Sequence, residues 1–294
     1  MTPGSWQPPC EPRVSRGEVS IQSELVLHLS LLGSELMISS DDYRWLELLA
    51  QLWEPFLTPE TATGGDRIHI STGGGRWMVD FFGEWTNSAT DPWLLAAAVR
   101  NAIVSRAEMR RQGGVPLHAG GVSRGDVLVL IAGPAGFGKT TLILELLQRG
   151  WTYFSDDLAL IDTDSGLVQP FPKPLQIKGA TAWDEHRILW APPSWLPPPR
   201  GSYLIPPSAF PVAEAPLAAA RLVFPVFRPG ARTELRPLSA AESLARCLQN
   251  LRGEPQFVPL ATATIRRLVA QAPAGELRHG AAPLAAQALQ EWVL

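Results

Sequence analysis

One stretch decides the fold class of this 294-residue chain: Val127-Leu-Val-Leu-Ile-Ala-Gly-Pro-Ala-Gly-Phe-Gly-Lys-Thr-Thr-Leu-Ile-Leu-Glu-Leu-Leu147. Its first six residues are continuously apolar, which is typical of a strand buried on both faces. Its last six residues favour a helix, and the segment between them fits the pattern GxxxxGK(S/T). The composition gives roughly 0.002 chance matches to this pattern, so the match is well above background. The stretch predicts an α/β fold built on a strand, a phosphate-binding loop (P-loop) and a helix.

The residues of this loop have defined chemical roles. Glycines let the backbone aim successive N–H groups at phosphate oxygens, at the positive end of the following helix dipole. Lys139 would contact the β- and γ-phosphates, and the hydroxyl of Thr140 would bind Mg²⁺. We therefore expect ATP and Mg²⁺ as cofactors. The expected nucleotide-binding residues of the loop and helix are Gly133, Ala135, Gly136, Phe137, Gly138, Lys139, Thr140 and Thr141.

Lysine is rare in this chain, since 22 of the 25 basic residues are arginine. The three lysines are Lys139, Lys173 and Lys178. Arginine is too bulky and planar for the point-charge contact that a P-loop lysine makes, which gives Lys139 a reason to be lysine. Lys173 lies between two prolines and has no predicted role.

Composition excludes several classes of protein. With 18% charged and 46% hydrophobic residues the chain is globular, and its net charge of −3, with scattered arginines, gives no reason to expect nucleic acid as a partner. No apolar stretch approaches the ~20 residues that span a bilayer, and residues 1–10 lack the features of a signal peptide. Cys10 and Cys247 have no nearby cysteine or histidine partners, which favours reduced thiols over a zinc site. We therefore expect a cytoplasmic protein without membrane contact.

Two adjacent carboxylates, Asp156 and Asp157, lie at a strand edge before an apolar run, with Asp156 seventeen residues after Lys139. A P-loop enzyme needs an acidic residue near Thr140 to hold Mg²⁺, and a kinase also uses a carboxylate to accept the proton of the acceptor hydroxyl. The pair could do both. By itself an Asp-Asp pair is more often a solvated turn, and the P-loop upstream is what favours the functional interpretation.

Around these motifs the sequence resembles a known family. Leu117-His-Ala-Gly-Gly-Val122, the P-loop and Leu146-Leu-Gln-Arg-Gly-Trp-Thr-Tyr-Phe-Ser-Asp-Asp-Leu-Ala-Leu-Ile-Asp162 resemble the catalytic domain of HPr kinase/phosphorylase and HprK-related kinases. Those are P-loop proteins akin in fold to phosphoenolpyruvate carboxykinase, and they phosphorylate serine hydroxyls. Some HprK-related members phosphorylate a precursor peptide during lasso-peptide maturation. The resemblance is strong over about residues 115–165.

The resemblance implies roles for individual residues. Asp156 would be the base that activates the acceptor hydroxyl, and Asp157 with Thr140 would hold Mg²⁺. His118 would lie beside the phosphates, where a structural histidine is the alternative. Lys139 would hold ATP.

One segment departs from the family pattern. Where the family has Glu-Ile-Arg-Gly, this chain has Gln176-Ile-Lys-Gly179, so a carboxylate is missing, and a reverse phosphorylase activity is in doubt. Lys178 could keep a positive charge facing the phosphates. Arg228-Pro-Gly230 resembles the family's Arg-Pro-Gly turn, so Arg228 is a candidate for stabilising charge on the transferring phosphoryl group; an ordinary surface arginine is the alternative.

The rest of the chain is divided by composition and periodicity. We expect a flexible arm over 1–20, an α+β domain over 21–112, and the catalytic domain over 113–294 with a Pro/Trp-rich loop at 180–216. Expected strands are 24–30, 35–38, 67–71, 76–82, 127–132 and 221–227, with turns at 72–75 and 162–166. Expected helices are one capped by Ser39 and Asp42 that ends at Pro55, then 91–111, 142–147, 239–251, 261–270 and 284–292.

Together these features predict a kinase that transfers the γ-phosphoryl group of ATP to a serine or threonine hydroxyl of a peptide or protein, with a lasso-type precursor peptide as one candidate acceptor. In this interpretation the Pro/Trp-rich loop closes over the acceptor, or it is a packed structural loop. Two alternatives stay open: a kinase for small-molecule hydroxyls, and a non-catalytic nucleotide-binding regulator that uses residues 1–112 for docking. The family's oligomers leave a homo-oligomer open as well.

Overall fold

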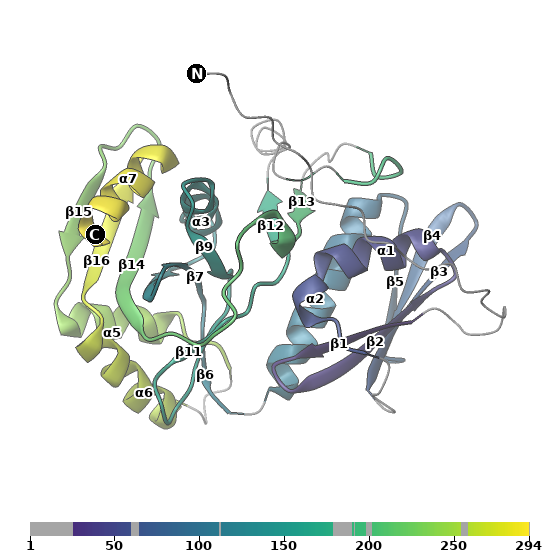
Figure 1. Ribbon diagram of the computed structural model, residues 1–294, viewed down its shortest axis with the longest axis horizontal. Helices are drawn as coiled ribbons and strands as arrows, with labels where there is room; N and C mark the ends of the chain where they lie inside the picture. The colour runs from purple at the N-terminus through teal and green to yellow at the C-terminus, as the bar shows by residue number, and fades with distance from the viewer. Residues whose placement is uncertain are drawn as a thin grey trace, which may run out of the picture.

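The computed structural model describes residues 26–59, 65–111, 113–178, 190, 192–197, 202–253 and 258–293. It is a mixed α/β structure with several sheets (Figure 1). We refer to residues 26–111 as the N-terminal lobe and to residues 113–293 as the C-terminal lobe. The expected arm over 1–20, and most of the segment between 179 and 201, lie outside the described residues.

The N-terminal lobe is a five-stranded sheet with two helices on one face (Figure 1). Its strands pair in chain order, and only β2 and β3 are parallel. Its elements are β1 (Val26–Leu31), β2 (Ser34–Ser40), α1 (Tyr43–Leu52), η1 (Glu54–Phe56), β3 (Asp66–Gly73), β4 (Arg76–Phe81), β5 (Trp85–Ala89) and α2 (Pro92–Arg110).

Local sequence explains most of these boundaries. Gly74 and Gly75 both have positive φ and join β3 to β4, as the glycine-rich turn predicts. Asp91 caps α2, with Pro92 in its first turn. The predicted cap of α1 was partly wrong: Asp42 alone caps the helix, while Ser39 lies in β2 and bonds His69.

The C-terminal lobe is a six-stranded sheet covered by helices on both faces. The strand order is β15-β16-β14-β8-β7-β9, and β14 runs parallel to β8 and β16. The strands are β7 (Ala119–Arg124), β8 (Val127–Ala132), β9 (Thr152–Ser155), β14 (Ala219–Phe227), β15 (Glu234–Pro237) and β16 (Ala274–His279). Helices α3 (Lys139–Gln148) and α7 (Ala282–Val293) pack together on one face, and α5 (Ala240–Gln249) and α6 (Val258–Gln271) on the other. The capping box of Ser239 and Glu242 at α5 is confirmed.

Two smaller sheets complete this lobe. A three-stranded sheet consists of β11 (Val168–Gln169), β10 (Ala159–Ile161) and β6 (Val115–Leu117), with the predicted aspartate turn at 162–166 between β10 and β11. A two-stranded sheet consists of β12 (Leu175–Lys178) and β13 (Ser202–Ile205). The expectation of an irregular loop through residue 216 was therefore wrong at 202–205, where pairing with β12 supplies the partner that makes a strand.

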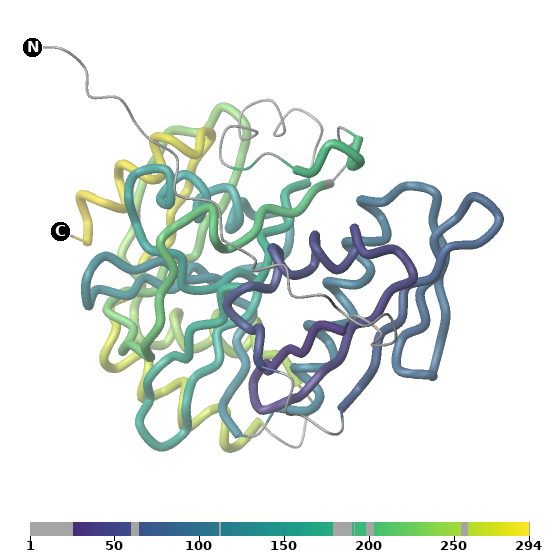
Figure 2. Tube along the Cα trace, turned by 45° about the vertical axis from the view of Figure 1, so that its right-hand side comes forward, coloured from purple at the N-terminus to yellow at the C-terminus, as the bar shows by residue number. Residues whose placement is uncertain are grey.

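Both lobes share a hydrophobic core. One cluster of buried apolar residues runs from the N-terminal sheet through α2 to α3 and α7. In the part of the proline-rich segment that is described, Trp195 packs edge-on against Trp45 with ring centroids 5.3 Å apart, and Tyr203 and Phe210 are buried. These aromatic rings belong to the core rather than to a lid. Figures 1 and 2 both show the lobes side by side, and in Figure 1 α2 lies on the side of the N-terminal lobe that faces the C-terminal lobe. No described helix combines the length and apolarity that crossing a bilayer requires.

Candidate active site

The loop Gly133–Gly138 leaves the end of β8 and leads directly into α3. Gly136 and Gly138 have φ of +85° and +89°, a region that residues with a side chain rarely adopt. A Cβ on Gly138 would lie 3.3 Å from Nε2 of His279, so the end of β16, the strand beyond β14 in the sheet, also packs closely against the loop. The strand before and the helix after this segment are those that the sequence motif predicts.

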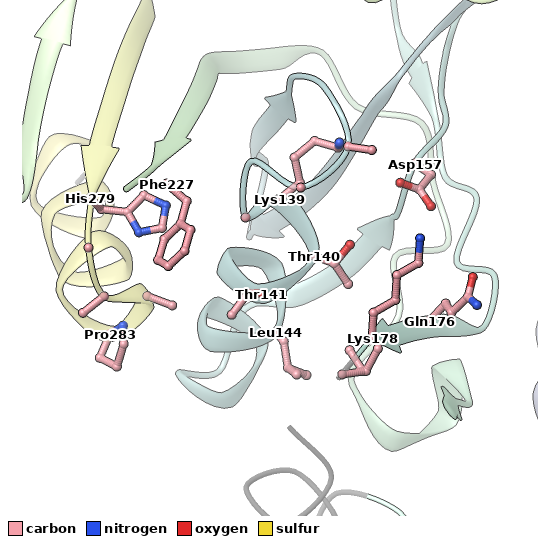
Figure 3. A pocket seen from close by; sticks show the side chains of 17 residues that line it. Lys139, Thr140, Thr141, Leu144, Asp157, Gln176, Lys178, Phe227, His279 and Pro283 are labelled. Atoms are coloured by element: carbon pink, nitrogen blue, oxygen red, sulfur yellow. The ribbon is translucent and has the colours of Figure 1, made fainter. Parts of the chain in front are cut away.

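A pocket of about 690 Å³ opens at this loop (Figure 3). The loop and the first turns of α3 form its floor, with Lys139 and Thr140 at the centre. Phe227, at the end of β14, and the segment His279–Pro283 line one side. Asp157 and the β12 residues Gln176–Lys178 line the other side. Of the nucleotide-binding residues expected from sequence, Ala135, Gly136, Gly138, Lys139, Thr140, Thr141 and Lys178 line this pocket.

Lys139 is held against its own loop. Its Nζ donates to the carbonyl oxygens of Gly133, at 2.7 Å, and Pro134, at 3.1 Å, and lies 3.0 Å from Nε2 of His118. Burial lowers the pKa of Lys139, and the nearby carboxylates oppose that change. A phosphate group entering the pocket would replace these carbonyls as the partner of the ammonium.

His118 connects the lysine to a second cation. Its Nε2 faces Lys139, and its Nδ1 lies 2.6 Å from Nη2 of Arg252 and 3.1 Å from the carbonyl oxygen of Asp157. Burial lowers the pKa of His118, and the charges of Lys139 and Arg252 lower it further. The imidazole is therefore neutral at pH 7. The structure places His118 against Lys139, and its position beside the phosphates stays a prediction.

The two carboxylates lie in different surroundings. Asp156 directly follows β9, is 1% exposed, and accepts a hydrogen bond from Oγ1 of Thr140 at 3.1 Å. Burial and the neighbouring Asp157 charge raise the pKa of Asp156. Asp157 has a φ of +62°, and its side chain is 33% exposed and lines the pocket. Burial by itself would raise the pKa of Asp157, but the cations Lys173 and Arg100 lower it to about 2.

Three residues that sequence reasoning did not assign also belong to this region. Lys173 is fully buried, with Nζ 3.9 Å from Oδ2 of Asp156 and 3.6 Å from Oδ2 of Asp157. Arg100, from α2, places Nη2 3.7 Å from the same oxygen of Asp157. His279 is the buried last residue of β16. Only Lys173 carried a sequence signal, which was the rarity of lysine.

Five expected site residues do not line the pocket described here: Gly133, Phe137, Arg228, His118 and Asp156. Of these, His118 and Asp156 contact the lining residues Lys139 and Thr140. Phe137 is 39% exposed at the tip of the loop. Arg228 is an exposed residue that follows β14, and its backbone N–H donates to the carbonyl oxygen of His279 at 2.9 Å. Its predicted role in phosphoryl transfer stays a prediction.

The residues present fit a magnesium ion that is shared with a nucleotide. The described residues contain no group of three or more His, Cys, Asp or Glu side chains that could enclose a metal. Mg²⁺ in phosphoryl-transfer sites usually has only one or two carboxylate ligands, and water and phosphate oxygens supply the rest. Oδ2 of Asp156 is buried without a hydrogen-bond partner among the described residues, next to the hydroxyl of Thr140. A cation at this point would supply that partner.

Comparison with known proteins gives little further information. No protein-family model matches the chain, and no curated protein matches it in sequence. Among solved structures, the chain is similar to the HPr(Ser) kinase/phosphatase from Coxiella burnetii, at 16% identity over 60% of this chain and 93% of that chain, with a TM-score of 0.28. That neighbour carries the name of the family that the sequence resembles. At this TM-score the likeness supports no argument about function. The function is therefore inferred from the residues of the pocket.

Proposed function

We propose that this protein is a kinase that uses ATP and Mg²⁺ to phosphorylate a serine or threonine hydroxyl of a peptide or protein. One observation carries the proposal: a glycine-rich loop, a buried lysine, a hydroxyl at the start of a helix and the carboxylate of Asp157 line one pocket, and the buried carboxylate of Asp156 accepts a hydrogen bond from that hydroxyl. In phosphoryl transfer the protein mainly positions the reactants and neutralises charge, and these groups supply both functions.

The two sides of the pocket differ in chemistry (Figure 3). The Phe227 and Pro283 side is aromatic and apolar, which suits a nucleobase. The Asp157 and Lys178 side is charged and polar, which suits the γ-phosphate and an acceptor hydroxyl. With the triphosphate on the loop between them, the nucleoside would lie towards β14 and α7, and the acceptor towards β12.

The geometry favours an exchange of the two carboxylate roles that the family resemblance implies. Asp156 is buried against Thr140 and has an oxygen without a partner, so we assign Mg²⁺ binding to Asp156 with Thr140. Asp157 faces the pocket, so we assign it the acceptor hydroxyl. Asp157 is ionised at pH 7 and would accept the hydroxyl proton as the new P–O bond forms and the bond to ADP breaks. Mg²⁺, when bound, would neutralise charge on the phosphates.

The acceptor class is tested by incubating the protein with Mg·ATP and a peptide library, and by detecting phosphopeptides by mass spectrometry. We expect Lys139→Ala and Asp157→Asn to abolish product, and Asp156→Asn to raise the Mg²⁺ concentration needed for activity. Phosphopeptide formation that survives both Lys139→Ala and Asp157→Asn would refute the proposal.

The same experiment separates the two rival functions. A small-molecule kinase would phosphorylate free metabolites and none of the peptides. A regulator without turnover would bind ATP, and its activities would be unchanged by Asp157→Asn.

A further inference from the structure

Two buried cations, Lys173 and Arg100, lie close to the carboxylates of Asp156 and Asp157. Lys173 is 0% exposed, and its backbone carbonyl accepts a hydrogen bond from the hydroxyl of Tyr153 at 2.8 Å. Its Nζ has no hydrogen-bond partner among the described residues, and its nearest anions are Asp156 and Asp157 at 3.9 Å and 3.6 Å. Burial of an ammonium ion without hydrogen bonds costs free energy of folding, and packing alone does not offset that cost. The charges of the two nearby carboxylates are what can offset it.

The second of these cations, Arg100, comes from the N-terminal lobe. Arg100, on α2, is buried, and its Nε donates to the carbonyl oxygen of Pro174 at 3.0 Å, next to Lys173 in the chain. Its Nη1 donates to Asn101, and its Nη2 has no hydrogen-bond partner and lies 3.7 Å from Oδ2 of Asp157. Arg100 thus fixes the segment that carries Lys173 and also faces Asp157.

Two cations and two carboxylates balance in charge before any metal arrives. None of the cation–oxygen distances, 3.6 to 3.9 Å, is a hydrogen bond, so the carboxylate oxygens keep lone pairs for a metal ion or a hydroxyl. A close ion pair would have occupied those lone pairs. The arrangement therefore stabilises two adjacent anions and leaves them available.

On the basis of the proposed kinase function, we propose that Lys173 and Arg100 are positioning residues that hold Asp156 and Asp157 in place for phosphoryl transfer. Helix α2 of the N-terminal lobe is then part of the active site. A second contact also links α2 to the site: Glu108 of α2 binds Nη1 of Arg252 at 2.6 Å, and Arg252 contacts His118.

The same helix provides a matched control. Arg106 is also a buried arginine of α2, but it pairs with Asp66 at 3.6 Å and Glu84 at 2.8 Å, both in the N-terminal lobe. Arg100→Met and Arg106→Met each remove a buried charge from α2. Only the first change alters the surroundings of the carboxylates.

The test compares turnover with nucleotide binding in the full chain. For Arg100→Met and Lys173→Met we expect kcat for Mg·ATP turnover to fall on the order of 100-fold, with the Kd for ATP in the absence of Mg²⁺ changed by less than about threefold. Arg100→Lys keeps the charge, so its kcat should be at least about tenfold higher than that of Arg100→Met. Arg106→Met should leave kcat within about twofold, at a temperature where all variants are folded.

Equal kcat losses in Arg100→Met and Arg106→Met, or a loss of thermal stability alone, would overturn the inference. Hydrogen exchange of residues 152–161 gives a readout that needs no ligand. Faster exchange there in Arg100→Met, and not in Arg106→Met, supports the positioning role, and the same exchange rates in both variants contradict it. A wild-type protein that neither binds nor turns over ATP would refute the kinase proposal, and the exchange experiment would still decide the role of Arg100.

Discussion

Phe227 offers the sharpest test of where a nucleotide lies. It is the last residue of β14, lines the pocket, and is 44% exposed. One part of the ring is covered by His279, with ring centroids 5.5 Å apart and planes tilted by 54°. The uncovered face is therefore available to a purine ring, and Phe227→Ala removes that face while leaving the loop and Lys139 unchanged.

The size of the effect follows from that single face. Stacking of a base on an aromatic side chain is worth about 1–3 kcal/mol by alanine substitution. Because His279 covers part of the ring, we expect the lower half of that range, about 1–2 kcal/mol. That free energy corresponds to an increase in the Kd for ATP of about 5- to 30-fold. Inorganic tripolyphosphate has no base, so its Kd should not change.

Isothermal titration of wild type and variant with ATP and with tripolyphosphate measures both quantities. Phe137→Ala is the matched control, since Phe137 is a comparably exposed aromatic residue of the loop that does not line the pocket. It should change neither Kd by more than about twofold. The assignment of the nucleoside to the β14 side is refuted if Phe227→Ala weakens tripolyphosphate as much as ATP, or weakens neither.

Two further predictions concern stability. Alanine at Gly136 or Gly138 must adopt a positive φ, at a cost of about 1–2 kcal/mol. Only at Gly138 does the new Cβ also press on buried His279, so denaturant unfolding should show Gly138→Ala to be less stable than Gly136→Ala; equal stability would contradict the close packing of β16 on the loop. Burial lowers the pKa of Lys173 from 10.5 to about 8, with Arg100 adding to the change. Between these values the unfolded chain binds the proton that the folded protein has lost, so the free energy of unfolding should rise with pH from 8 to 10.5, by up to about 3 kcal/mol. A Lys173→Met variant should lack that rise, and an identical pH profile in both proteins would contradict the burial of the charge.

The sequence was most informative where local chemistry determines structure. The loop between β8 and α3, the caps Asp91 and Ser239, and the β3–β4 turn all follow from residues adjacent in the chain. Strand β16 was not predicted because Ala-Gly-Glu-Leu-Arg-His has no clear period, and its partners β14 and β15 hold it as a strand. Tertiary pairing there overrides local preference.

The sequence predicted less about the geometry of the site than about the fold. Asp156 and Asp157 are adjacent, so no spacing rule indicates that one is buried on Thr140 and the other opens to the pocket. That difference depends on the positive φ of Asp157, an uncommon conformation for a residue other than glycine. Arg100 lies 56 residues before Asp156 on a helix with several arginines, and only the packing of the two lobes identifies which arginine reaches the carboxylates.

The position of β16 also bears on how the protein is made. This strand pairs with β14 along one edge, yet 46 residues of chain separate Phe227 at the end of β14 from Ala274 at the start of β16. At translation rates of about 5–20 residues per second, that edge of β14 leaves the ribosome at least about 2–10 s before its partner. During this interval an apolar strand edge is exposed and the wall of the pocket at His279 is missing. Chaperone binding at this stage would compete with aggregation through the exposed edge of β14.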